Sequence, residues 1–372
     1  MTAGSGHRRA AEAVAEAVRQ RDPKAAVRCE DFLALTPSWW RTAYPRVYRR
    51  FVTHMPWAWG WLYHVLDQAW VFACYQPLRR RWNRWVARAF LRQLITQQPD
   101  VVIVTHFLPA DVVTWAKRAG LIRARVITVV TDFYPHRMWM VQEADEVVVG
   151  IEETAQVCRR LGVRPERVHV YGIPMSRQFV MTADRSRWFQ TLQLDPARKT
   201  VLVTSGGMGV GPLEQLAQGL MALERSAPGR LQLIIVCGDN QPLVDRLKRL
   251  SQQAAMPIRV FGFVETMGEL MHISDVIITK PGGLTVVESL AVGIPMILCG
   301  AIPGQERANA DYLVRQGAGV NAEDASRAVA LLEELVAHPA RLEEMRARAK
   351  ALGKPQAAAR IVEELLAGAG HG

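Results

Sequence analysis

The sequence predicts an α/β protein built from two doubly wound, Rossmann-like domains whose parallel sheets face a cleft. Its 372 residues are enough for two domains of ordinary size, each with its own core. Short β-branched runs alternate with helical stretches along most of the chain, which is the pattern of parallel sheets. Glycine-rich turns follow some of these strands and lead directly into helices, as in sheets that bind ligands at their carboxyl edge.

Charge, cysteines and hydropathy limit the classes of protein to consider. The formal net charge of +11 implies an anionic partner, which is a nucleic acid, a phosphorylated substrate or an acidic membrane. The five cysteines are far apart and form no CxxC motif, so we interpret them as reduced core thiols of a cytosolic protein. No signal peptide is visible, and no run of about twenty apolar residues could span a bilayer. Any membrane contact is therefore expected to be peripheral.

The chain opens on a glycine-rich turn, Gly4-Ser5-Gly6, that leads into a helix with Ala10 and Val14 on one face. Such a turn normally follows an apolar strand, and that strand is missing here. We therefore expect the true start of the gene to lie upstream. Without the strand, the sheet should keep an unpaired seam beside the strand at Val101–Thr105 or close imperfectly.

His7 lies at the start of this first helix, directly after Gly6. One interpretation is a helix residue without a catalytic role. The other is a general base, because histidine titrates near neutrality and a substrate can reach the end of a helix. We keep His7 as the candidate base and assign Gly6 to the acceptor side.

A segment at about 36–99 holds eight of the eleven tryptophans and ten arginines against one acid, Asp67, for a net charge of +9. Tryptophan beside arginine on helices without acids is typical of a surface that docks on anionic lipid. Some of these aromatics must belong to the core, and such mixtures also bind single-stranded nucleic acid. We favour the membrane over nucleic acid. The residues assigned to this surface are Trp57, Trp59, Trp61, Arg79, Arg80 and Arg81.

Polar side chains follow the predicted strands of the amino-terminal half. His106 comes after the strand at Asp100–Thr105, and Asp132 and His136 come after the strand at Arg125–Val130. Open α/β sheets bind ligands at these strand ends, so a purely structural role for Asp132 is disfavoured, although it could orient a histidine instead of reacting itself. We assign Asp132 to catalysis. His106, His136 and the nearby Trp139 are assigned to the acceptor.

The second half opens on a strand at Thr200–Thr204 and a glycine-rich loop at Ser205–Gly211, which can lie over a diphosphate. Within it we assign Gly206, Gly207 and Met208 to the donor. The loop is neither GxGxxG with an acid after the next strand nor a P-loop, which disfavours a Rossmann dehydrogenase and a Walker NTPase. After a later strand, backbone groups following Phe263 could pair with the edge of a base.

The richest stretch is Asp275–Asn309. A β-branched strand turns directly into a helix through two glycines, which is a place for a phosphate. Glu288 on that helix could accept hydrogen bonds from a ribose. An ordinary strand–turn–helix is the plainer interpretation, because short glycine motifs have many false positives. The residues that favour a nucleotide-sugar site are Gly282, Gly283, Leu284, Thr285 and Glu288 with Gln305, Glu306 and Asn309.

These features suggest a GT-B-type glycosyltransferase, and the motifs resemble the monogalactosyldiacylglycerol synthase family, whose bacterial members include diacylglycerol glucosyltransferases. The resemblance covers nearly the whole chain and departs at the amino terminus. The motifs that carry it are Gly4–Ala11, Thr131-Asp132-Phe133 with His136 and Trp139, Ser205–Gly209, Lys280–Thr285 with Glu288, and Gly304–Glu306 with Asn309. We expect an acceptor and membrane-binding domain at 1–175, a donor domain at 176–350, and a helix at 351–372 that crosses back.

The resemblance implies transfer of a hexose from UDP-glucose or UDP-galactose to the hydroxyl of diacylglycerol, with inversion. His7 matches the proposed base. By this resemblance Phe263 and Val264 would bind uracil, and Glu288 would bind the ribose. Gly207, Gly283 and Leu284 would bind the diphosphate. Gln305, Glu306 and Asn309 would bind the sugar.

No Asp-x-Asp motif is present, so we expect no obligatory metal and no cofactor. We expect peripheral binding to anionic lipid on the cytoplasmic face of the cell membrane, and no nucleic-acid partner. Two alternatives stay open. One is a related GT-B transferase that uses UDP-GlcNAc on a lipid-linked wall precursor, and the other is a non-catalytic membrane protein that senses UDP-sugar.

Overall fold

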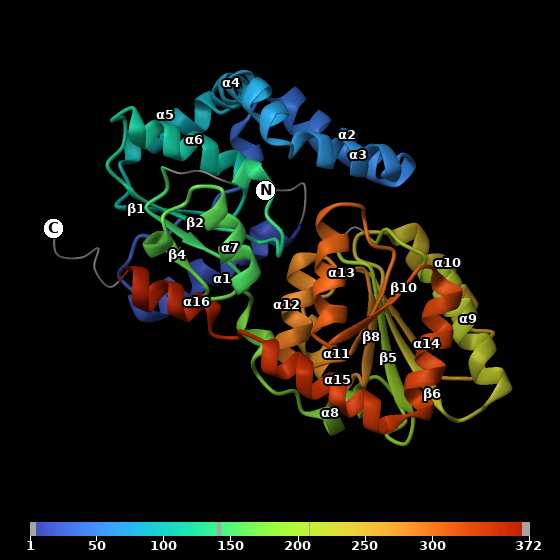
Figure 1. Cartoon of the computed structure of the whole chain (residues 1–372). Coiled ribbons are helices and arrows are strands. Elements are labelled where there is room, and N and C mark those ends of the chain that lie inside the picture. The colour runs from blue at the N-terminus through green and yellow to red at the C-terminus, as the bar shows by residue number, and fades with distance from the viewer. Residues whose placement is uncertain (1–4, 140–142, 208, 367–372) are drawn as a thin grey trace. The chain divides into compact units, whose positions relative to one another are not determined.

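The computed structural model describes residues 5–139, 143–207 and 209–366 (Figure 1). The chain forms two compact units. The first unit comprises Met1–Ser176, Pro303–Gln305 and Gln356–Gly372, and the second comprises Arg177–Ile302 and Glu306–Pro355. Each unit is described by itself below.

The first unit contains a four-stranded parallel sheet of order β1-β2-β3-β4. β1 pairs only with β2 among the described residues, and the first three of its four residues are only half-buried. β2 is buried except for its first residue. The sheet therefore has an open edge at β1, where the sequence predicts a seam. The strands are β1 (Val101–Val104), β2 (Arg125–Val129), β3 (Glu146–Val148) and β4 (Val168–His169).

Helices cover both faces of this sheet (Figure 1). On one face, Val14 of the first helix and Ile361 near the chain's end pack against Ile127 of β2. On the other face, Leu91 and Val112 pack near Val126 of the same strand. The alternation of Val126 and Ile127 between two cores is what a strand buried on both faces requires. The helices are α1 (Ser5–Arg21), α5 (Arg88–Gln97), α6 (Phe107–Arg118), α7 (Glu152–Arg160) and α16 (Ala357–Arg360), continued by a π-helical turn at Ile361–Leu366.

Three further helices form the tryptophan-rich segment: α2 (Ser38–His54), α3 (Pro56–Leu66) and α4 (Ala69–Val86). α4 packs on both α5 and α6. No helix within the described ranges is long and apolar enough to cross a lipid bilayer.

The second unit contains a six-stranded parallel sheet of order β10-β9-β8-β5-β6-β7. The chain runs outward from β5 through β6 to β7 on one side, and from β8 through β9 to β10 on the other. The switch point therefore lies between β5 and β8, where open α/β sheets leave a crevice for a ligand. The strands are β5 (Lys199–Thr204), β6 (Leu231–Val236), β7 (Ile258–Phe261), β8 (Val276–Thr279), β9 (Met296–Cys299) and β10 (Gly319–Ala322).

Helices also cover both faces of the second sheet (Figure 1). On one face, Leu220, Leu247 and Leu332 share a buried core with Val201 and Ile235 of the strands. α11 and α12 lie on the other face, and α15 packs on α12 and α14. The helices are α8 (Arg185–Thr191), α9 (Leu213–Ser226), α10 (Gln241–Ser251), α11 (Met267–Ile273), α12 (Gly283–Val292), α13 (Gln305–Arg315), α14 (Ala325–Ala337) and α15 (Pro339–Leu352).

The cysteines correct one expectation. All five are free, as predicted, but Cys29 and Cys74 are exposed and only Cys158, Cys237 and Cys299 are buried. Cys29 lies in the loop after α1, and Cys74 lies on a solvent-facing side of α4. The expectation that all five are core thiols was therefore wrong for these two.

Candidate functional site

His7, in the first turn of α1, is held between the ends of two neighbouring strands. Its Nδ1 lies 2.9 Å from the backbone oxygen of Thr105 and 2.7 Å from Oγ1 of Thr131, and Thr105 Oγ1 donates to the His7 backbone oxygen at 2.8 Å. A carbonyl oxygen only accepts, so Nδ1 carries the hydrogen. In the neutral ring, Nε2 therefore holds the free electron pair, which is what a general base needs.

Aromatic rings surround His7. His106 meets it edge-on with ring centroids 4.6 Å apart, and Trp139 lies 6.2 Å away. His106 is fixed because its Nδ1 accepts a hydrogen bond from the Leu108 backbone at 3.1 Å and its ring stacks on Phe107 at 4.2 Å. Burial lowers the pKa of His7 to about 4 and the pKa of His106 well below its usual range. Both imidazoles are therefore neutral at pH 7.

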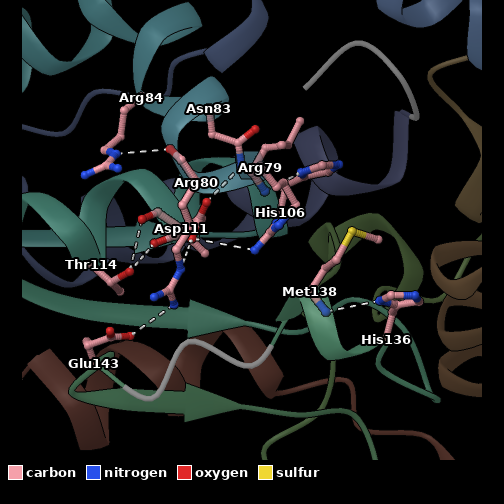
Figure 2. A network of polar contacts seen from close by, with 12 residues as sticks. Arg79, Arg80, Asn83, Arg84, His106, Asp111, Thr114, His136, Met138 and Glu143 are labelled. Atoms are coloured by element: carbon pink, nitrogen blue, oxygen red, sulfur yellow. Dashed lines mark hydrogen bonds and ion pairs between the residues drawn. The ribbon is translucent and has the colours of Figure 1, made fainter. Parts of the chain in front are cut away.

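Asp132 is buried beside the same rings, and its Oδ2 accepts a hydrogen bond from Trp139 Nε1 at 3.0 Å. The carboxylate therefore positions the indole that flanks His7. His136 is satisfied as a neutral ring, because Nδ1 accepts from the Met138 backbone at 3.1 Å (Figure 2) and Nε2 donates to the Tyr63 oxygen at 3.2 Å. Burial lowers the pKa of His136, against the opposing effect of Asp67.

Asp67, the one acid of the tryptophan-rich segment, ties that segment to the loop after β2. Its Oδ1 accepts from the Arg137 backbone at 2.8 Å, and its backbone oxygen accepts from Arg137 Nε at 2.6 Å. Asp67 follows the last residue of α3, and His136 bonds to Tyr63 within α3. The end of α3 and the residues that follow Asp132 are therefore joined.

A buried carboxylate on α6, Asp111, changes the interpretation of two arginines (Figure 2). Arg80 Nε donates to it at 3.1 Å, Asn83 Nδ2 donates at 2.8 Å, and Arg79 Nη2 lies 3.6 Å away. The Arg79 side chain is only 13% exposed, and its burial lowers the pKa of the guanidinium. Arg79 and Arg80 therefore anchor α4 to α6, and only Arg81 of the predicted lipid-binding triplet is exposed.

The tryptophans of this segment divide in the same way. Trp57, Trp61 and Trp70 are 72%, 65% and 73% exposed, whereas Trp59 is half-buried with its ring 5.2 Å from that of Tyr48. Trp57, Trp61 and Trp70 are therefore the rings of this segment that remain available for contacts outside the chain. Trp59 instead helps to join α3 to α2.

The buried histidines make stability sensitive to acid. In the unfolded chain a histidine titrates near pH 6.5, whereas in the fold burial lowers the pKa of His7 to about 4 and the pKa of His106 well below its usual range. The unfolded state binds more protons in that window, so the free energy of unfolding should fall as pH drops from 6.5 towards 4, by up to about 1.4 kcal/mol per pH unit for each histidine. Denaturant unfolding at pH 7.5, 6, 5 and 4.5 measures this slope. His106→Gln should flatten it, and an unchanged slope in that variant would contradict the assignment.

In the second unit, the loop at Ser205–Gly211 and the turn at Lys280–Gly282 follow β5 and β8, on either side of the switch point. Gly206 has a φ of +75°, and a Cβ on Gly238 would lie 2.2 Å from the Gly207 oxygen. Glycine at these positions lets the backbone approach closely and keeps the loop compact. Met208 lies outside the described residues.

Lys280 was not among the residues predicted for the donor site. Its Nζ forms an ion pair with Glu306 Oε1 at 2.7 Å, and Glu306 Oε2 accepts from the Ile302 backbone at 2.9 Å. One turn along α13, Asn309 Nδ2 donates to the Pro281 oxygen at 2.8 Å. These contacts bring the predicted Glu306 and Asn309 beside the turn after β8. A charged residue directly after a central strand was a usable signal, but its pairing with Glu306 was not visible in the sequence.

The other predicted donor residues are spread over the second unit. Glu288 is 3% exposed in α12, and Leu284 and Thr285 are half-buried in its first turn with Gly283. Phe263 is 50% exposed and Val264 is half-buried, and both lie in the loop after β7. Gly262 of this loop lies near the backbone oxygen of Gly238, which belongs to the loop after β6. Gln305 is the first residue of α13 and is grouped with the first unit. Among the described residues, no three or more His, Cys, Asp or Glu side chains are grouped to hold a metal ion.

Two protein families match the chain. The family described as monogalactosyldiacylglycerol (MGDG) synthase matches residues 7–175, and the glycosyltransferase family 28 C-terminal domain matches residues 200–361. The processive diacylglycerol beta-glucosyltransferase of Bacillus mycoides (strain KBAB4) is 33% identical over 288 residues, which covers 77% of this chain and 72% of that protein. The protein of the same name from Bacillus cytotoxicus is 33% identical over 291 residues, with the same coverage of 77% and 72%.

Solved structures share the fold. MurG of Acinetobacter baumannii superposes with a TM-score of 0.57 at 18% identity, over 77% of this chain and 78% of that one. UDP-GlcNAc 2-epimerase of Neisseria meningitidis, bound to UDP-GlcNAc, superposes with a TM-score of 0.59 at 16% identity, over 77% and 82%. Together with the two parallel sheets, these likenesses confirm the predicted α/β architecture of the GT-B type.

Proposed function

Since this chain belongs to the monogalactosyldiacylglycerol synthase family and is a glycosyltransferase with a family 28 C-terminal domain, we propose that it transfers glucose or galactose from a UDP-sugar to the free hydroxyl of 1,2-diacylglycerol, with inversion. The observation that carries this proposal is the orientation of His7, whose Nδ1–H is held by Thr105 and Thr131. The ring is thereby prepared to take a proton at Nε2.

The proposed reaction is a single displacement. The acceptor oxygen bonds to C1 of the sugar, the bond from C1 to the β-phosphate oxygen breaks with its electron pair on UDP, and the hydroxyl proton passes to Nε2 of His7. The lowered pKa of His7 keeps the base unprotonated at neutral pH. Since its basicity is low, the proton moves late, once the new bond has made the hydroxyl acidic. Asp132 acts through Trp139, which it orients beside His7.

Binding of the donor nucleotide is proposed for the second unit. The glycine loop after β5 and the start of α12 offer backbone N–H groups to the diphosphate, and Glu288 is assigned to the ribose. Phe263 and Val264 are assigned to uracil, and Gln305, Glu306 and Asn309 to the sugar. A UDP-sugar donor is further supported by a solved relative in fold, the Anabaena protein HepE in complex with UDP-glucose, which has a TM-score of 0.52 at 15% identity over 74% of this chain and 82% of that one. We propose that no metal is required, so turnover should survive EDTA.

We also propose that the chain works as a peripheral protein on the cytoplasmic face of the cell membrane. Diacylglycerol stays in the bilayer, so its transferase must reach the lipid surface. Exposed Trp57, Trp61 and Trp70, with Arg81, support a docking surface for anionic lipid on α3 and α4.

The alternative acceptor is a lipid-linked wall precursor with UDP-GlcNAc as donor, because a GT-B fold by itself does not identify the acceptor. A competition assay separates the two. Purified protein would receive equal UDP-glucose, UDP-galactose and UDP-GlcNAc with vesicles of diacylglycerol. We expect one hexosyl lipid with a β linkage, since these donors are α-linked, and NMR coupling at C1 reads that linkage. An α-linked product would contradict inversion, and consumption of UDP-GlcNAc alone would favour the wall precursor.

A further inference from the structure

Lys280 is a partly buried cation to which the function proposed above assigns no task. Its side chain is 14% exposed, and its Nζ lies 2.7 Å from Glu306 Oε1. Its Cε lies 3.4 Å from the position that a Cβ on Gly206 would take. The lysine therefore stands between the glycine loop after β5 and the first turn of α13, at the switch point of the second sheet.

The groups around Lys280 are suited to an anion. α12 starts at Gly283 without a side-chain cap and without an acid in its first turn, so its N–H groups and positive dipole end are available. Ser205, directly after β5, is 4% exposed, and its Oγ lacks a hydrogen-bond partner in the described part of the chain. A buried hydroxyl without a partner costs free energy, which a phosphate oxygen would relieve.

Among the described residues, Glu306 is the only acidic residue that forms an ion pair with Lys280. Glu306 keeps a second contact of its own, since Oε2 accepts from the Ile302 backbone. It can therefore stay in place when the lysine turns away. An ammonium at the end of a flexible stem carries three donors and moves easily from one oxygen to another.

We propose that Lys280 is a catalytic residue of the donor site. When the donor binds, its ammonium moves away from Glu306 and binds the β-phosphate of the nucleoside diphosphate. When the bond between C1 and the β-phosphate oxygen breaks, its electron pair stays on that oxygen, and the negative charge of UDP rises by one. The ammonium of Lys280 offsets this charge. Because the ammonium of Lys280 has moved away, Glu306 Oε1 is free to accept a hydrogen bond from a sugar hydroxyl. This inference deepens the proposed function and rests on it for the identity of the donor.

Calorimetric titration with UDP and with uridine tests the inference, because only UDP carries the diphosphate. Lys280→Met should raise the Kd for UDP about 10- to 100-fold and leave the Kd for uridine unchanged. Lys280→Arg should retain most of the UDP affinity. Glu306→Gln should bind UDP a few-fold more tightly, since the carboxylate no longer competes for Lys280, although hexose transfer is lost. Lys199→Met is the matched control, because this 44% exposed lysine lies at the opposite end of β5.

Two results would overturn the inference. Unchanged UDP affinity in Lys280→Met would mean that the lysine does not touch the diphosphate. If the affinities for UDP and for uridine fall equally, the ion pair only stabilises the loops. In that case the unfolding temperature should also fall. If the lysine variant behaves as expected but the unaltered chain makes no glycolipid, the inference stands and the diacylglycerol proposal falls. If the unaltered chain binds no UDP, both fall.

Discussion

Replacement of His7 by alanine is expected to lower kcat about 1,000-fold while the Kd for UDP stays within about twofold of its original value. General bases contribute about 10²- to 10⁴-fold to rate, and the Nε2 of His7 is the atom that the bonds to Thr105 and Thr131 leave free. UDP affinity should not change, because the groups proposed for the nucleotide belong to the second unit. Turnover on diacylglycerol vesicles and calorimetry with UDP measure the two effects.

The control for His7→Ala is His338→Ala, an exposed histidine between α14 and α15 of the second unit, which should keep full turnover. A variant of intermediate effect is Thr131→Val, which keeps the ring but removes one of its two Nδ1 contacts. We expect a loss of about fivefold from this change, since one hydrogen bond stabilises by roughly 1 kcal/mol. Full turnover in folded His7→Ala would mean that another group is the base.

Removal of the three most exposed tryptophans, in the triple variant Trp57→Ala, Trp61→Ala and Trp70→Ala, should weaken binding to anionic vesicles about 10,000-fold or more. Each ring can bury on the order of 100 Å² at the lipid surface, which at about 25 cal/mol per Å² is worth about 2 kcal/mol or more. The rings are not part of a core, so the unfolding temperature should change little. Vesicle co-sedimentation measures the loss.

Turnover of the triple variant should fall in parallel on vesicles, with UDP affinity unchanged. The control is the variant Leu121→Ala, Val180→Ala and Met181→Ala, which removes exposed apolar side chains outside α2, α3 and α4 and should bind vesicles normally. If the tryptophan variant binds vesicles as well as the unaltered chain does, α3 and α4 are not the docking surface. Binding to RNA, weakened by salt, would then return the segment to the nucleic-acid interpretation.

The sheets and their turns were predictable because their signal is local. The β-branched run Val276–Thr279 and the glycines that follow it occupy a few consecutive residues, and they form β8 and the start of α12 as expected. Residues that end parallel strands also gather at one edge without further information. This is why Thr105 and Thr131 both reach His7, although they lie 98 and 124 positions away from it in the sequence.

Pairings between distant residues could not be predicted in the same way. Arg79, Arg80 and Arg81 look alike in the sequence, and only the burial of Asp111 on α6 separates two structural cations from one that faces solvent. Lys280 and Glu306 are 26 positions apart on different turns, and no periodicity connects them. Trp59 and Trp61 differ likewise, since exposure depends on which helix face meets α2. In each case the tertiary contact decides the role of a residue whose type alone leaves it open.

The most direct test of the proposed activity is transfer of label from UDP-glucose and UDP-galactose into lipid by the purified chain, on mixed vesicles of diacylglycerol and anionic lipid. We predict a chloroform-soluble product that carries the hexose on the free hydroxyl of diacylglycerol, formed with at least one of the two donors. A chain that is folded and binds UDP, yet yields no such lipid with either donor, would contradict the diacylglycerol proposal.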